Sequence, residues 1–241
     1  ANNHSLDFGT DALLDTCRTL DEAGIRYVGA GENMARARQL ETVEVKGKII
    51  GFLGSSRVIP VYDWTAGEQK PGVAITYDPG MLLKDIAAAK QVCDYVVVYV
   101  HWGKEKAVTP EEYQQTMGRQ YIDAGADLVI GSHPHVLQGI EYYQGKPIVY
   151  SLGNFVFGSS IPKTALLAAE WDGETTRLSL IPGTSSAGYT RMLTDEKGKA
   201  EFYDYMTGLS FGAAVDENGR VSEIRPEEPL QQDPSQRLDE P

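Results

Sequence analysis

The sequence contains four histidines, and each lies in or beside a short segment of small or turn-forming residues. His133 and His135 are separated by one proline and follow an apolar run that ends at Gly131. His101 directly follows a second apolar run, and His4 lies in a polar segment near the start of the chain. Neutral imidazole is a common ligand for zinc, iron and similar ions. This distribution favours a single metal-binding site over four unrelated surface histidines.

Three polar side chains near these histidines could take part in the same chemistry. Asn3 offers an amide oxygen, which suits harder ions such as manganese. Asp7 and Glu105 each follow a histidine by a few residues, where a carboxylate can orient an imidazole through its second ring nitrogen. A solvated surface carboxylate is the alternative interpretation of either acid. The sequence lacks the Gly-x-Ser-x-Gly nucleophile turn, the Gly-x-x-x-x-Gly-Lys-Ser/Thr phosphate loop and the Gly-x-Gly-x-x-Gly dinucleotide turn.

Two runs of strand-forming residues lead into the histidines. Residues 94–100 read Asp-Tyr-Val-Val-Val-Tyr-Val and end at His101, and residues 127–130 end just before the segment that holds His133. Such a continuous apolar run is typical of a strand buried on both faces. Between the two runs, residues 109–112 read Thr-Pro-Glu-Glu and predict a helix start, with a capping-box pair and proline at the first helical position. Strand, helix and strand in this order predict parallel strands whose carboxyl ends bring the histidines together.

The rest of the chain alternates helices and strands in its first half and is a series of hairpins in its second half. This order predicts a layered α/β fold with mixed sheets. The expected helices are residues 11–23 with Thr10 as N-cap, 33–40, 79–91, 109–124 and 203–209. The expected strands are residues 25–28, 42–45, 48–53, 94–100, 127–130, 139–143, 146–151, 155–157, 166–171, 175–181 and short segments at Val215 and Val221. We expect a loop over residues 57–77, one domain over residues 1–224, and a disordered tail over residues 225–241, which are rich in proline, acids and glutamine.

The composition limits the classes of function. The 241 residues are 41% hydrophobic and 23% charged, which is typical of a globular protein. The net charge of −12 argues against nonspecific binding to nucleic acid or anionic lipid. Cys17 and Cys93 stand in no metal-binding spacing and are expected to be buried thiols, with a disulfide left open. No apolar run reaches the roughly 20 residues of a membrane helix, so a leader or anchor is expected only upstream of Ala1.

Five ordered segments of the sequence resemble one protein family. They are residues 2–9 (Asn-Asn-His-Ser-Leu-Asp-Phe-Gly), 29–33 (Gly-Ala-Gly-Glu-Asn), 100–105 (Val-His-Trp-Gly-Lys-Glu), 125–139 (which contain Gly-Ser-His-Pro-His) and 146–155 (which end in Ser-Leu-Gly-Asn-Phe). The set is similar to the poly-γ-glutamate capsule biosynthesis proteins of the CapA/PgsA type, which resemble a branch of the calcineurin-like metallophosphoesterases. The resemblance implies a calcineurin-like four-layer αββα sandwich with mixed sheets, N-terminally truncated so that the opening strands of one sheet are missing.

The resemblance also implies roles for single residues. Asn3 and His4 match an Asn-His motif, in which the asparagine binds a metal and the histidine acts as general acid or phosphate contact. His101 matches a lone metal-binding histidine, and His133 and His135 match a pair that supplies one ligand to each of two metals. The residues expected beside the metals or the substrate are Asp7, Glu105 and Asn154.

The sequence departs from that superfamily in a way that affects the site. The acid-rich first motifs of the superfamily, which supply a bridging carboxylate, are expected upstream of Ala1. Three histidines and one asparagine carry little negative charge, so the metal site of this chain alone is expected to be incomplete. In proteins with the pattern that this chain resembles, an aromatic residue is common at the position of Lys106. The implied cofactor is a divalent metal, either manganese, iron or zinc.

Two functions stay open at this point. In the first, the protein is a metal-dependent hydrolase of poly-γ-glutamate biosynthesis or export, acting on a phosphoester or a γ-glutamyl amide. In the second, it is a non-enzymatic polymer-binding or assembly subunit that retains the fold. Either function implies poly-γ-glutamate or another acidic substrate, membrane capsule-synthesis subunits as partners, no nucleic acid, and an extracellular, membrane-anchored location. The acidity is unusual for a protein that binds a polyanion, which favours chemistry at a small site or metal-bridged binding.

Overall fold

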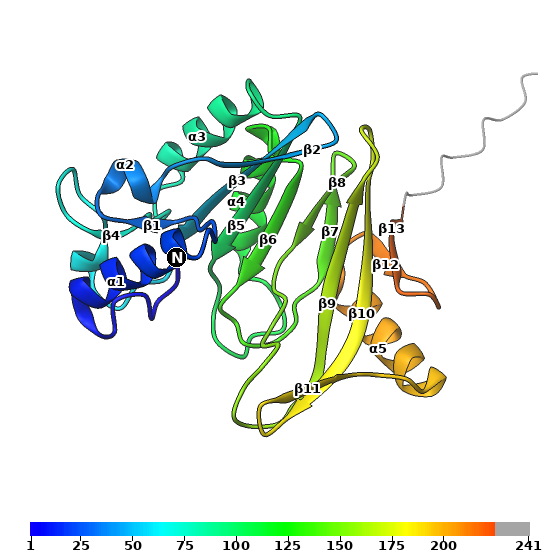
Figure 1. Ribbon diagram of the computed structural model, residues 1–241. Helices are drawn as coiled ribbons and strands as arrows, with labels where there is room; N and C mark the ends of the chain where they lie inside the picture. Colours follow the sequence, from blue (N-terminus) through cyan, green and yellow to red (C-terminus); the bar gives the residue numbers. More distant parts are fainter. Residues whose placement is uncertain (225–241) are drawn as a thin grey trace, which may run out of the picture.

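The computed structural model describes residues 1–224, which form two main β-sheets with helices around them (Figure 1). The expected α/β class with mixed sheets is confirmed. The first sheet has six strands in the order β2-β3-β5-β6-β8-β7. Its four inner strands are parallel and its two edge strands are antiparallel to their neighbours. The strands are β2 (Glu41–Val45), β3 (Lys48–Ser56), β5 (Tyr95–His101), β6 (Leu128–Ser132), β7 (Ile140–Tyr143) and β8 (Lys146–Val149).

Strand β5 is apolar up to its last residue, His101, because most of both faces of the first sheet is covered. Val98 lies in a core cluster with side chains of helices α3 (Gly80–Lys90) and α4 (Glu112–Asp123). Its neighbour Val97 lies in a different cluster, which the first sheet shares with the second. Successive side chains of a strand point to opposite faces, so a strand between two cores must be apolar at nearly every position.

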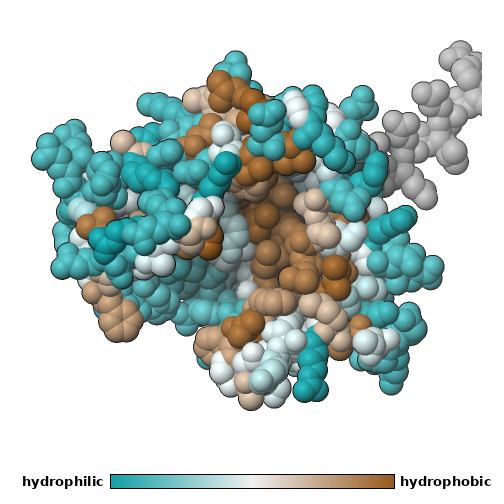
Figure 2. Space-filling view, viewed as in Figure 1, coloured by the Kyte–Doolittle hydropathy of each residue, from teal (hydrophilic) through white to brown (hydrophobic). Residues whose placement is uncertain are grey.

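The second sheet is built on the long hairpin of β9 and β10. Strand β9 pairs with one edge of β10, and the other edge of β10 pairs with β13 and β11. Helix α5 contributes to the core between the two sheets. Part of the space between the sheets is an open apolar hollow, lined by first-sheet side chains and by Ala169 and Trp171 of β9 (Figure 2). The elements are β9 (Ile161–Trp171), β10 (Thr176–Ser186), β11 (Tyr189–Met192), α5 (Glu196–Leu209), β12 (Ala213–Val215) and β13 (Arg220–Glu223).

A small N-terminal layer packs beside the carboxyl end of β3. The segment after β4 returns to the end of β3. There the backbone N–H of Ser56 donates to Ala74, and the carbonyl of Ser56 accepts from Thr76. Leu6, which precedes the first helix, is buried in the apolar cluster of this layer. The anchoring of Leu6 holds the polar segment before it near the carboxyl edge of the first sheet. The elements are α1 (Gly9–Glu22), β1 (Ala30–Gly31), α2 (Met34–Ala37), the 3-10 helix η1 (Tyr62–Trp64) and β4 (Gly72–Val73).

The starts of two helices differ from the prediction. Helix α1 begins before Thr10, so Phe8 and not Thr10 is the N-cap residue. Helix α4 begins later than predicted, and its capping box joins Glu111 to Gln114. The Gln114 side chain is buried and also donates a hydrogen bond to Gln138. This long-range contact fixes Gln114 at the third helical position, and Glu111 is therefore the N-cap residue.

Two predicted short strands are wrong. Residues 25–28 and 155–157 join no ladder in the described part of the chain. Both segments contain strand-forming residues, but Ile25 and Phe157 are exposed. Their backbone hydrogen bonds join them to Leu20 of a helix and to Gly188 of a turn, not to a strand. Helix α5 is longer than predicted, and the predicted loop over residues 57–77 contains η1 and β4. The predicted tail over residues 225–241 lies outside the described residues.

The two thiols and the membrane prediction can be compared directly with the structure. Cys17 and Cys93 are buried and free, as expected, and they lie in separate core clusters. Within residues 1–224, no helix combines the length and the apolar character that crossing a bilayer requires.

Candidate metal centre

The carboxyl ends of β5 and β6 bring three histidines to one point. His101 ends β5 and lies opposite Ser132, the last residue of β6. His133 follows directly, and its ring centroid is 4.7 Å from that of His101 and 6.0 Å from that of His135. The predicted gathering of these histidines is therefore observed. It depends on the parallel register of two strands far apart in the sequence.

The segment that carries His133 and His135 turns sharply. Both residues have positive φ angles, 102° and 61°, a region that side chains other than glycine rarely occupy. Such strain is maintained only where surrounding structure over-determines it, and it is frequent at functional sites. Gly131 permits the approach before the turn, since a Cβ there would lie 2.1 Å from the carbonyl oxygen of Tyr150.

His101 is held through both ring nitrogens. Its Nε2 lies 2.8 Å from Asn3 Oδ1, and its Nδ1 lies 3.1 Å from Ser132 Oγ. Because the amide oxygen can only accept, Nε2 carries the proton and Nδ1 accepts from the serine hydroxyl. Burial, reinforced by the neighbouring His133, lowers the pKa of His101 to about 3. His101 is therefore a neutral imidazole near pH 7, and it would bind a metal directly only by giving up one of these two hydrogen bonds.

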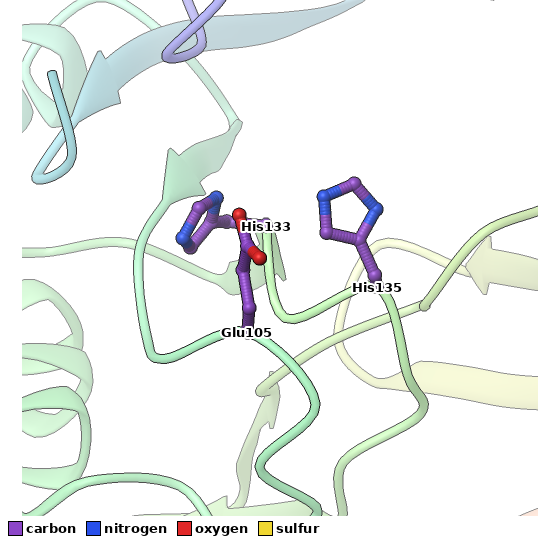
Figure 3. Close-up of side chains that lie close together, drawn as sticks. All are labelled: Glu105, His133 and His135. Carbon is purple, nitrogen blue, oxygen red and sulfur yellow. The ribbon is translucent and has the colours of Figure 1, made fainter. Parts of the chain in front are cut away.

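Glu105, His133 and His135 form the one group of three acidic, cysteine or histidine side chains within residues 1–224 whose possible ligand atoms lie within 4.8 Å of one another. Figure 3 shows Glu105 on the loop after β5, with its carboxylate beside the ring of His133 and on the side that faces His135. His133 is buried and its Nδ1 has no hydrogen-bond partner. Burial lowers the pKa of His133, although the charge of Glu105 acts in the opposite direction. A buried polar atom without a partner is costly, and an ion bound through this nitrogen would satisfy it.

The donor chemistry of this group fits a divalent metal. One carboxylate and two imidazoles are a common ligand set for zinc, iron and manganese. His135 is already oriented, because its Nδ1 lies 2.7 Å from Asn154 Oδ1, which leaves Nε2 free to bind. Glu105, which the sequence suggested as an orienting group, thus lies where it can be a ligand.

His4 and Asp7 form a separate pair at the rim of the site. His4 Nδ1 lies 2.7 Å from Asp7 Oδ2, and both side chains are exposed. His4 Nε2 lies 3.4 Å from the amide nitrogen of Asn3. The N-terminal segment therefore meets the strand ends, as the motif predicted.

One cavity of about 440 Å³ connects most of these side chains. Sequence reasoning missed Ser132 and Tyr99, which also line it. The identity of Ser132 as the strand residue beside His101 could only come from the register. The polar and ionisable side chains that line the cavity are those of Asn3, His4, Tyr99, His101, Ser132, His133, His135 and Asn154.

A family model described as bacterial capsule synthesis protein PGA_cap matches residues 1–159. The chain belongs to this family. The matched region contains every strand of the first sheet and all of the histidines. The second sheet follows it in the sequence, so the PGA_cap signature coincides with the part of the chain that builds the candidate metal centre.

Curated relatives agree with this family. The capsule biosynthesis protein CapA of Bacillus anthracis is 35% identical over 215 residues, which cover 86% of this chain and 52% of the relative. The PGA biosynthesis protein CapA of Bacillus subtilis is 39% identical over 165 residues, covering 68% and 43%. The probable polyglutamine synthesis accessory protein MT0602 of Mycobacterium tuberculosis is 36% identical over 165 residues, covering 65% and 43%. This PGA_cap chain therefore spans about half the length of the curated relatives it matches.

Among solved structures, the NAD nucleotidase NadN of Haemophilus influenzae aligns with a TM-score of 0.38 and 13% identity, covering 80% of this chain and 33% of its own. A likeness of this size is too small to define the fold or the chemistry of the PGA_cap chain.

Proposed function

We propose that this chain carries a metal-dependent hydrolase site of poly-γ-glutamate capsule biosynthesis. The observation that carries the proposal is the convergence of Glu105, His133 and His135, with a buried and unpartnered nitrogen on His133. The cluster lies at the carboxyl ends of parallel strands, where open α/β sheets bind their ligands. Membership of the capsule synthesis family gives the biological setting.

In this proposal, several residues bind the metal and one donates a proton. Glu105, His133 and His135 would hold the metal, and His101 with Asn3 would complete its surroundings. A divalent metal in such a site polarises a phosphoryl or carbonyl oxygen and lowers the pKa of a bound water. His4 is the candidate general acid, because its ring is held through Nδ1 by Asp7 and, when the ring is doubly protonated, its Nε2 can deliver a proton to a leaving group.

The substrate, metal and location in this proposal follow from chemistry and family. The substrate is a phosphoester or a γ-glutamyl amide, and the metal is manganese, iron or zinc. We place the site outside the cell, because a capsule is an extracellular polymer, with an anchor and membrane capsule-synthesis subunits as partners. The names of relatives as capsule and polyglutamine synthesis proteins support this setting.

Metal content and turnover of the full-length protein test the proposal. We expect stoichiometric manganese, iron or zinc by elemental analysis, together with hydrolysis of p-nitrophenyl phosphate or γ-glutamyl-p-nitroanilide. His133→Ala should lose both metal and turnover. His4→Ala is the matched control, since it should keep the metal and lose turnover. A metal-free wild-type protein, or a His133→Ala variant with unchanged turnover, would contradict the proposal and favour a non-enzymatic assembly subunit.

A further inference from the structure

A second and larger cavity opens beside the candidate metal centre. It has a volume of about 740 Å³ and shares Glu105, His135 and Asn154 with the centre or its immediate contacts. Its other walls come from the loop after β8, from the start of β9 and from α5. A substrate that reacts at the metal centre and is longer than one residue would extend into this space.

Two lysines give this cavity a charge opposite to that of the whole protein. Lys106 and Lys163 line it, and neither forms an ion pair with a carboxylate within residues 1–224. Among the residues that the structure describes, Glu105 is the only acid on its wall, and it belongs to the possible metal group. In a chain of net charge −12, an unneutralised cationic wall next to the reactive centre favours an anionic occupant.

Contacts with neighbouring segments fix the positions of both lysines. Lys106 has a φ of 62°, and its backbone N–H donates to the carbonyl of Pro134, at 2.7 Å, between the two site histidines. The loop that carries Lys106 is therefore tied to the loop that carries His133 and His135. Lys163 lies on β9, with its Nζ 4.9 Å from the ring centroid of Tyr205. Such a cation–π contact orients an ammonium group without neutralising its charge.

The remaining wall suits a peptide chain. Phe157 is half exposed, and its ring centroid lies 6.2 Å from that of His135. Ser159 and Ser160 add hydroxyl groups that can pair with amide groups. Apolar and hydroxyl surface with two separate cations matches a backbone of methylenes and amides that bears carboxylates at intervals.

We propose that this cavity is the binding subsite for an acidic peptide polymer, in which Lys106 and Lys163 each bind a carboxylate of the chain and lead it to the metal centre. The proposal rests on the proposed function for the direction of the chain, but the binding itself needs no metal. It also explains how an acidic protein can hold a polyanion, because the cationic groups are confined to one cavity.

The test is binding of a synthetic γ-linked glutamate oligomer to the full-length protein in the presence of EDTA, by isothermal titration calorimetry. Exposed lysine–carboxylate pairs are individually weak, so Lys106→Gln combined with Lys163→Gln should weaken binding about threefold to tenfold. The matched control is Lys46→Gln combined with Lys84→Gln. It makes the same charge change at two exposed lysines that have no carboxylate partner in the described chain and lie away from the cavity.

Each result decides the matter. Equal weakening by the control pair, or no binding by the wild-type protein, overturns the subsite. Equal competition by polyphosphate of the same charge also overturns it, because the cavity would then bind any anion. Measuring binding in EDTA separates the two proposals, since the hydrolase needs the metal and the subsite does not. Lysine-dependent binding in a protein without turnover would retain the subsite and reject only the hydrolase.

Discussion

Replacing Asn154 should weaken metal binding although Asn154 need not touch the metal. Its Oδ1 lies 2.7 Å from Nδ1 of His135, which fixes the proton on Nδ1 and leaves Nε2 as the ligand atom. Asn154→Ala removes this control. Loss of such an orienting partner typically costs 10- to 100-fold in metal affinity, which corresponds to about 1.4 to 2.8 kcal/mol.

The loop itself should survive the substitution. The backbone carbonyl of Asn154 accepts a hydrogen bond from the buried hydroxyl of Thr164 at 2.8 Å, and alanine leaves this contact intact. One lost side-chain hydrogen bond costs about 1 kcal/mol of folding free energy. The unfolding temperature of the metal-free protein should therefore change by only a few degrees.

Calorimetric titration of the metal-free protein with Zn²⁺ or Mn²⁺ measures the effect. Asn154→Asp is the informative companion, because a carboxylate at this place keeps the acceptor and raises the basicity of the imidazole. It should retain or increase the affinity, while Asn218→Ala, at an exposed turn, should leave it unchanged. Wild-type affinity in Asn154→Ala, or equal losses in the alanine and aspartate variants, would refute the reasoning.

Three further predictions concern the scaffold and the thiols. Gly131→Ala should destabilise the protein by roughly 1–3 kcal/mol or more in urea unfolding, because its Cβ would lie 2.1 Å from the Tyr150 carbonyl oxygen; an unchanged midpoint would contradict the packing. Asp127→Ala should lower the free energy of unfolding by about 1.5 to 3 kcal/mol, since the largely buried Asp127 carboxylate accepts from two partly exposed lysines and one backbone N–H; a loss below about 1 kcal/mol would show that the pairs contribute little. Cys17 and Cys93 should react with Ellman's reagent only slowly until denaturant is added, because both are buried and burial raises the pKa of Cys93; rapid labelling of the native protein would contradict their burial.

The sequence by itself determined the strands that carry the histidines and the edge of the sheet at which they meet. A run of β-branched residues long enough for one strand, with no polar face, must be buried on both sides. A helix between two such runs makes them parallel, so the ends of both lie together. This reasoning placed His101 near His133 and His135 without any coordinates. The hairpins predicted between residues 139–143 and 146–151, and between Val215 and Val221, are also observed, because a polar residue followed by glycine favours a tight turn between two strands.

Only the tertiary structure decided which polar side chains meet. Asn3 bonds to His101 across 98 residues of sequence, and no local pattern encodes that pairing. The position of Glu105 among possible ligands, and not behind an imidazole, depends on the loop that Lys106 ties to Pro134. The physical reason is range: propensity and periodicity act within a few turns of chain, whereas a binding site is made by the packing of distant segments.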